Sequence, residues 1–216
     1  MLVSFGFSEG SGTTTANGTK RTGTASLLNT TWTTSGKNGN ALVFASASPS
    51  RVSLPIWPMQ MAPTKSMTVM MWVYPTSDPG ANENALFSWA DTTYGSCFEI
   101  ESFDYSGSGP LGNPSVYIQL TDANYHPLYG TSKLALNIWT HIAVTFDGSN
   151  IRLYRNGTLE QTAVASGQMF SCLDSFEFGS ETAWGEAYDG RIDEIRVFDK
   201  ALSATEITRL MNTAVP

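Results

Sequence analysis

One segment, residues 139–157, limits the possible folds most strongly, because it encodes a run of short strands joined by tight turns. In Trp139–Phe146 the apolar side chains fall largely on alternate positions, which is the period of a strand with one buried face. The sequence DGSN at 147–150 is typical of a tight turn. Residues 151–155 alternate again, and the Asn-Gly pair at 156–157 is a strong hairpin signal. The segment therefore predicts three successive antiparallel strands.

The rest of the chain adds further strands and a single helix. Ile192, Ile195 and Val197 mark a strand, and Ser203 with Glu206 three residues later forms a capping-box pattern that predicts a short helix. Other predicted strands span residues 2–7, 41–44, 51–54, 67–74, 85–90, 97–102 and 115–120. The strand at 67–74 is the most apolar and should be central. We predict loops at 104–114 and at 125–129.

Composition and charge exclude several classes of protein. Only 14% of residues are charged and the net charge is −7, which disfavours nucleic-acid binding because phosphate recognition needs a concentrated basic surface. No apolar run approaches the roughly 20 residues that span a bilayer, so we expect no membrane insertion. Neither a linker nor a repeat divides the chain. We expect one domain over residues 1–216, with its core at about 2–212.

The quoted strands carry a family resemblance. WTHIAVTFDGSNIRLYRNGTL followed by GRIDEIRVFDKALSATEI resembles laminin-G-like, concanavalin A-like jelly-roll modules, and LVSFGFSEGSGTT, WTTSGKNGNALVF and SMTVMMWVYPTS agree in order. The resemblance covers Leu2–Asn212 and implies an all-β, two-sheet antiparallel jelly-roll sandwich with one short C-terminal helix. We predict an inner face formed by Phe5, Phe44, Val69, Met71, Val73, Ile142, Val144, Phe146, Leu153 and Ile195.

The same resemblance suggests where the protein acts. Such modules belong to secreted and cell-surface proteins, so we expect an extracellular or surface location as part of a larger protein. Met1 leads directly into a predicted strand without a signal-peptide pattern. This beginning fits either an excised module or a virion structural protein. Cys97 and Cys172 form a disulfide in one interpretation and stay as two buried thiols in the other.

The resemblance also implies a weakened calcium site. Jelly-roll modules of this kind often bind one Ca²⁺ near the N- and C-terminal strands, and the matching residues here are Asn17, Gly18, Thr19 and Asp193. Ca²⁺ prefers six to eight oxygen ligands, including carboxylates. The neutral Asn17 and the nearby Lys20 and Arg21 should lower the affinity. The alternative is that Asp193 hydrogen-bonds a neighbouring loop without a metal.

Aromatic and polar residues near the predicted strand ends are candidates for binding a sugar, which presents an apolar C–H face ringed by hydroxyls. The alternative is that these aromatic side chains close the ends of the core. The candidate set is Tyr94, Asp104, Tyr105, Asp122, Asn124, Tyr125, His126, Tyr129 and Trp184.

Catalysis has weaker support. Glu99 and Glu101 alternate on one strand, as do the carboxylates of some glycosidases, but the E-x-D-x-x-E pattern of the related glucanases is absent. We interpret both as the solvent face of their strand, and His126 and His141 lie in no nucleophile motif. The sequence predicts a non-catalytic module that binds a polysaccharide or glycoprotein surface through its loops. A structural decoration domain is the first alternative, and a polysaccharide-degrading enzyme is the second.

Overall fold

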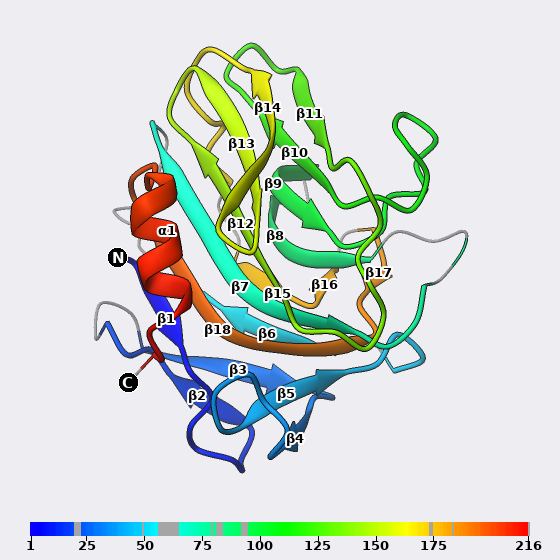
Figure 1. Ribbon diagram of the computed structural model, residues 1–216, viewed down its shortest axis with the longest axis vertical. Coiled ribbons are helices and arrows are strands. Elements are labelled where there is room, and N and C mark those ends of the chain that lie inside the picture. Colours follow the sequence, from blue (N-terminus) through cyan, green and yellow to red (C-terminus); the bar gives the residue numbers. More distant parts are fainter. Residues whose placement is uncertain are drawn as a thin grey trace.

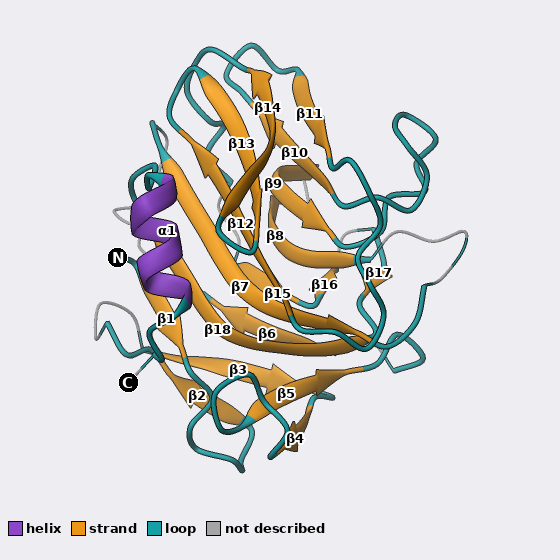
Figure 2. Ribbon diagram, viewed as in Figure 1, coloured by secondary structure: helices purple, strands orange, loops and turns teal. Residues whose placement is uncertain are grey.

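The computed structural model describes residues 1–19, 23–48, 50–55, 65–78, 80, 84–91, 95–172, 175–182 and 184–215. Their strands form two large curved antiparallel sheets, each with eight strands, and one two-stranded hairpin (Figures 1 and 2). The predicted all-β, two-sheet architecture is therefore confirmed. No helix in this part of the chain is long and apolar enough to cross a bilayer.

The first sheet contains the segment that dominates the sequence pattern. Its order is β14 (Thr158–Val164), β13 (Asn150–Arg155), β12 (Thr140–Phe146), β7 (Met67–Pro75), β18 (Gly190–Phe198), β5 (Ala41–Phe44) and β4 (Thr31–Thr33), and β1 (Val3–Phe5) also pairs with β18. The three strands predicted from residues 139–157 onward are β12, β13 and β14. As expected, the apolar strand β7 is central, because it pairs with both β12 and β18.

The second sheet carries most of the candidate binding residues. Its order is β11 (Tyr125–Tyr129), β10 (Ser115–Gln119), β9 (Gly95–Glu101), β8 (Ala85–Asp91), β15 (Phe176–Phe178), β6 (Arg51–Leu54), β3 (Thr24–Leu28) and β2 (Thr14–Ala16). The hairpin consists of β16 (Ser180–Glu181) and β17 (Glu186–Ala187). The loop predicted at 125–129 is wrong, because these residues form β11. Pro127 is compatible with β11 because this strand lies at the sheet edge, where a missing N–H is tolerated.

The core lies between the two sheets and follows the alternation along each strand. In β7, Met67, Val69, Met71 and Val73 belong to the main core, while Met70 faces the other way. All ten predicted inner-face residues are buried in this core, so that prediction is confirmed. Burying one such side chain stabilises the fold by about 1.5–3 kcal/mol.

The helix α1 (Ala204–Met211) packs on the outer face of the first sheet (Figure 1). Ser203 and Glu206 form the predicted capping box. Ile207 and Leu202 are buried against Met70, Ala143, Tyr154 and Phe198, and Leu210 and Met211 pack beside them. The predicted apolar face of the helix is thus confirmed.

A disulfide joins β9 to the segment that precedes β15. Cys97 and Cys172 are paired, with their Cα atoms 5.9 Å apart and a sequence separation of 75 residues. Closing a loop of this length stabilises the native state by about 4 kcal/mol in the chain-entropy model. This pairing settles the alternative that the sequence leaves open, and it fixes the strand that carries Glu99 and Glu101.

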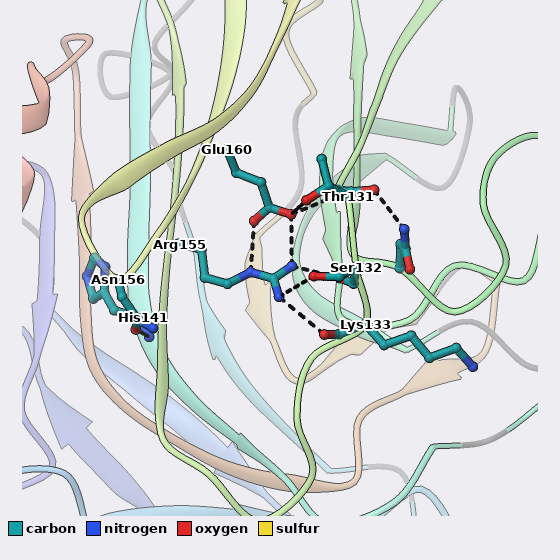
Figure 3. A network of polar contacts seen from close by, with 9 residues as sticks. Thr131, Ser132, Lys133, His141, Arg155, Asn156 and Glu160 are labelled. Carbon is teal, nitrogen blue, oxygen red and sulfur yellow. Dashed lines mark hydrogen bonds and ion pairs between the residues drawn. The ribbon is translucent and has the colours of Figure 1, made fainter.

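A polar network holds the end of β11 against the β13–β14 hairpin (Figure 3). Arg155 donates to both carboxylate oxygens of Glu160, at 2.8 and 2.9 Å, and to the Ser132 carbonyl at 2.7 Å. The Thr131 backbone N–H donates to Glu160 at 2.7 Å. Because residues 131 and 132 directly follow β11, this network fixes the outer edge of the second sheet.

Candidate functional site

The candidate site is a groove of about 300 Å³ on the outer face of the second sheet, the face that points away from the core. In β9, Phe98 and Ile100 point into the core, so Glu99 and Glu101 point outward. The same alternation in β10 directs Tyr117 outward between the core residues Val116 and Ile118. Strand register places Tyr117 opposite Glu99.

Loops and the small hairpin complete the groove. It is lined by Ser96, Glu99, Glu101, Ser106, Ser108, Tyr117, Tyr125, Trp184 and Glu186. Trp184 and Tyr125 are the exposed aromatic residues of this lining, at 67% and 46%. They converge over Gly95, where a Cβ atom would lie 2.8 Å from the Tyr125 hydroxyl and 3.7 Å from the Trp184 ring. Gly95 also has φ +83°, a second reason for glycine at this position.

Three carboxylates meet at the floor of the groove. One carboxylate oxygen from each of Glu99, Glu101 and Glu186 lies within 4.8 Å of the other two. Glu99 and Glu101 are only 6% and 2% exposed, so interpreting them as the solvent face of a strand is wrong. They point outward as predicted, but residues of the 102–113 loop and the 180–187 hairpin line the same groove and exclude solvent.

The electrostatics of these carboxylates are unfavourable. Burial, followed by repulsion from Glu186, Glu101 and Glu181, raises the pKa of Glu99 well above its usual value. Glu101 accepts a hydrogen bond from the Ser115 hydroxyl at 2.7 Å. No lysine or arginine is among the described residues that line the groove. The site therefore favours ligands that are neutral or positively charged.

Asp104 supports the groove from below. It is 1% exposed, and its two carboxylate oxygens accept hydrogen bonds from the Ser106 backbone N–H at 2.8 Å and the Tyr117 hydroxyl at 2.9 Å. The Tyr117 hydroxyl also lies 3.1 Å from the Ser106 hydroxyl. Asp104 thus positions two residues that line the groove, and ligand binding by Asp104 itself stays a prediction.

Other predicted ligand residues lie outside the groove. Tyr105 donates to Asp78 at 2.5 Å and accepts from Lys133 at 3.0 Å. Tyr129 packs edge-on against Tyr117, with ring centroids 6.1 Å apart, and faces a different depression.

Three more predicted residues, Asp122, Asn124 and His126, lie in the turn before β11 or at the start of that strand. Asp122 accepts from the Asn124 backbone N–H at 3.0 Å and lies 3.3 Å from His126 Nε2, so these side chains bind one another. Tyr94 lies outside the described residues. Of the predicted residues that the structure describes, only Tyr125 and Trp184 line the groove.

The residues predicted to bind calcium make hydrogen bonds within the fold. The Asp193 carboxylate accepts backbone hydrogen bonds from Lys37, Asn38 and Glu194 at 2.8–3.0 Å. Burial is the main reason that the pKa of Asp193 rises to about 7. The Asn17 amide instead binds β1, accepting from the Ser4 N–H at 3.0 Å and donating to the Leu2 carbonyl at 3.1 Å.

Gly18 and Thr19 also bind β1, through the Ser4 and Leu2 carbonyls. Ser4 pairs with Arg196, and a β-bulge separates Arg196 from Asp193 along β18. Calcium binding by Asn17, Gly18, Thr19 and Asp193 stays a prediction; Lys20 and Arg21 lie outside the described residues.

Sequence reasoning missed part of the groove. Both the 97–102 and the 115–120 strands are predicted from the sequence. The alternation in residues 115–120 could have placed Tyr117 on the same sheet face as Glu99 and Glu101. Glu186 and the loop serines had no local signal, since they reach the groove only through the tertiary fold.

Comparisons with known proteins agree with the two-sheet fold. The model of the concanavalin A-like lectin/glucanases superfamily matches residues 47–208. None of the curated proteins matches the chain in sequence.

Among solved structures, domain 4 of AbnA, an extracellular GH43 arabinanase from Geobacillus stearothermophilus determined with arabinotriose, aligns with TM-score 0.73 and 19% identity, covering 97% of both chains. The binding domain of Paraclostridial Mosquitocidal Protein 1 aligns with TM-score 0.74 and 15% identity over 98% of this chain and 51% of that one. The receptor-binding domain of botulinum neurotoxin mosaic serotype C/D aligns with TM-score 0.71 and 17% identity over 97% and 49%. At these identities the likeness shows the fold.

Proposed function

Because the chain belongs to the concanavalin A-like lectin/glucanase superfamily, we propose that it is a non-catalytic recognition module that binds a glycan in the groove on its second sheet. The observation that carries this proposal is the meeting of two exposed aromatic side chains, Trp184 and Tyr125, over a floor of carboxylates and hydroxyls. Among the structural neighbours, domain 4 of AbnA was determined with arabinotriose, and the domain of Paraclostridial Mosquitocidal Protein 1 is a binding domain, which supports the same class of function.

The groove chemistry suits a neutral sugar. The ring faces of Trp184 and Tyr125 can pack against the apolar C–H face of a pyranose or furanose ring. The carboxylates of Glu99, Glu101 and Glu186 can accept hydrogen bonds from sugar hydroxyls, while the groove serines can donate or accept. Uronic acids and sulfated sugars would be repelled by the same carboxylates. We propose that the ligand is a neutral oligosaccharide of an extracellular polysaccharide or glycoprotein.

A glycan array followed by calorimetry tests this proposal. Binding should weaken at least tenfold, or about 1.4 kcal/mol, in Trp184→Ala and in Tyr125→Ala. Ile138→Ala is a control, since Ile138 is 57% exposed and does not line the groove. If all three variants bound the glycan equally well, the glycan-binding site would lie elsewhere on the protein. No binding to any glycan, together with oligomers that form as concentration rises, would favour a structural role in assembly.

One observation favours a second candidate, glycoside hydrolysis. Oxygens of Glu99 and Glu101 lie within 4.8 Å of each other, near the roughly 5 Å separation of the carboxyl groups in retaining glycosidases. The raised pKa of Glu99 suits a general acid. Release of reducing ends from a polysaccharide panel, lost in Glu99→Gln, would establish this activity. Absence of any product would leave the binding function alone.

A further inference from the structure

The floor of the groove has the arrangement of an oxygen-lined cation site. Oxygens of Glu99, Glu101 and Glu186 lie within 4.8 Å of one another. An ion placed between three oxygens that all lie within 4.8 Å of one another can be no farther than about 2.8 Å from each, which is close to the Ca²⁺–oxygen range of about 2.3–2.6 Å. Mg²⁺ and Zn²⁺ need distances near 2.0–2.1 Å, so at the upper limit of this spacing they would require a larger movement of the carboxylates than Ca²⁺ would.

Two buried oxygen atoms at this position have no hydrogen-bond partner among the described residues. One is Oε1 of Glu99. The other is the hydroxyl of Ser88, which is 1% exposed. Ser88 lies directly opposite Glu99 in the β8–β9 register, so the two side chains share the outer face of the sheet. Buried polar atoms are normally satisfied, and a bound cation is one way to satisfy both oxygens together.

The surrounding charges support a cation more than an anion. Glu181 lies close enough to Glu99 to repel it, so the charge of the cluster extends beyond the three carboxylates. Arg51, an arginine of this sheet, is paired with Glu177 at 3.2 Å. A divalent ion would offset the repulsion between the carboxylates, and all the available ligands are oxygens, which hard cations prefer.

We propose that Glu99, Glu101 and Glu186 bind one Ca²⁺ ion at the floor of the groove, with the Ser88 hydroxyl beside it. This position differs from the one predicted from the sequence at Asp193 and Asn17. The side of the ion that faces Trp184 and Tyr125 is open to the groove. Sugar hydroxyls can occupy the remaining coordination positions there, which links the cation to the proposed function without requiring it.

Calcium titration of the chelator-treated protein, by calorimetry and by thermal unfolding, tests this site in the absence of any sugar. We expect one bound ion per chain and a rise in Tm with calcium concentration, since a ligand that binds only the folded state stabilises it. Glu99→Gln and Glu101→Gln should each weaken binding at least tenfold and reduce the shift in Tm. Glu177→Gln is the matched control, because Glu177 lies on the same sheet face but is paired with Arg51.

Two outcomes would overturn the proposal. The first is the absence of calcium binding by the wild type, which would mean that a shared proton relieves the repulsion between the carboxylates. The second is a calcium response that persists in Glu99→Gln and disappears in Asp193→Asn, which would assign the ion to the position predicted from the sequence. Glycan binding is measured separately before and after chelation, so a groove that binds sugar but no calcium overturns only the cation proposal.

Discussion

Two groups of buried carboxylates in this protein have opposite surroundings. Glu194, in the first sheet, lies 3.0 Å from the Arg196 guanidinium, and their side chains are only 2% and 4% exposed. Its carboxylate also accepts the Val215 backbone N–H at 2.7 Å, which ties the end of the chain to β18. Glu99, in the groove, is just as buried but is surrounded by other carboxylates.

The difference separates a structural role from a binding role. Where a buried carboxylate has a guanidinium and backbone donors, as in Glu194 and in the Glu160 network of Figure 3, its charge is satisfied within the fold. Where carboxylates are gathered beside exposed aromatic rings, burial and mutual repulsion raise the pKa of Glu99, and a ligand or cation bound in the groove would offset that repulsion. The first arrangement should increase the free energy of unfolding. The second should change the free energy of unfolding very little, whereas ligand binding should depend on it.

The largest effect is expected when Arg196 is replaced. Arg196→Met leaves Glu194 buried without its counter-ion, and breaking such a pair typically costs about 3–5 kcal/mol. Urea unfolding measures the change. The double variant Arg196→Met/Glu194→Gln should recover part of the loss, because it buries no unpaired charge. If Arg196→Met lowered the free energy of unfolding by less than about 1 kcal/mol, the pair that Glu194 forms would contribute no more than an exposed ion pair, and the two groups of carboxylates would not differ in their structural role.

A smaller loss is expected at the edge network. Arg155→Ala should lower the free energy of unfolding by about 2 kcal/mol, because Glu160 loses two charged hydrogen bonds. Arg152→Ala is the matched control, since Arg152 pairs with the more exposed Asp147 and should cost less than about 1 kcal/mol. If both variants lost the same free energy of unfolding, burial of an ion pair would not determine how much that pair stabilises the fold.

The pH dependence of stability sharpens the comparison at His141. Burial, then Arg196 and Lys37, lowers the pKa of His141 from 6.5 to about 3, and neither ring nitrogen has a hydrogen-bond partner among the described residues. Between these pH values the unfolded chain binds a proton that the folded protein does not. Stability therefore falls as the pH drops from 6.5 towards 3, by up to about 1.4 kcal/mol per pH unit.

His141→Phe keeps an aromatic ring against Trp72 and cannot bind a proton. Chemical unfolding of both proteins between pH 3 and 7 gives a difference curve that removes contributions from other groups. The wild type should lose stability relative to the variant as the pH falls. A flat difference curve would mean that folded His141 is protonated as readily as in the unfolded chain.

The smallest effect on stability is expected in the groove. In chelator-treated protein at pH 7, Glu99→Gln should leave the free energy of unfolding unchanged or raise it by up to about 1 kcal/mol, because the amide is not repelled by Glu101 and Glu186. Differential scanning calorimetry measures this change. A clear decrease in the free energy of unfolding would mean that the charge of Glu99, like that of Glu194, stabilises the fold.

Much of the architecture could be predicted because its signals are local. The alternation in β12 and β13, the Asn156-Gly157 turn and the Ser203–Glu206 capping box each depend on residues a few positions apart. Strand β11 was missed because Pro127 and the polar Tyr125 and His126 mask its alternation, and only its position at a sheet edge makes this composition acceptable.

The candidate site depends instead on contacts between distant segments. The sequence placed Glu99 and Glu101 on one strand face, but their burial comes from the 102–113 loop and from Trp184 and Glu186. Tyr125 and Trp184 were candidates as isolated aromatic residues, and no local pattern could show that they converge over Gly95.

The sequence by itself determined that this chain folds into paired antiparallel sheets with one capped helix, because side-chain period and turn chemistry are properties of neighbouring residues. Only the tertiary structure decided the Cys97–Cys172 pairing and the gathering of Glu99, Glu101 and Glu186. Distances between segments far apart in the chain are set by how the sheets stack and curve, and the resulting groove is where ligand binding can be tested.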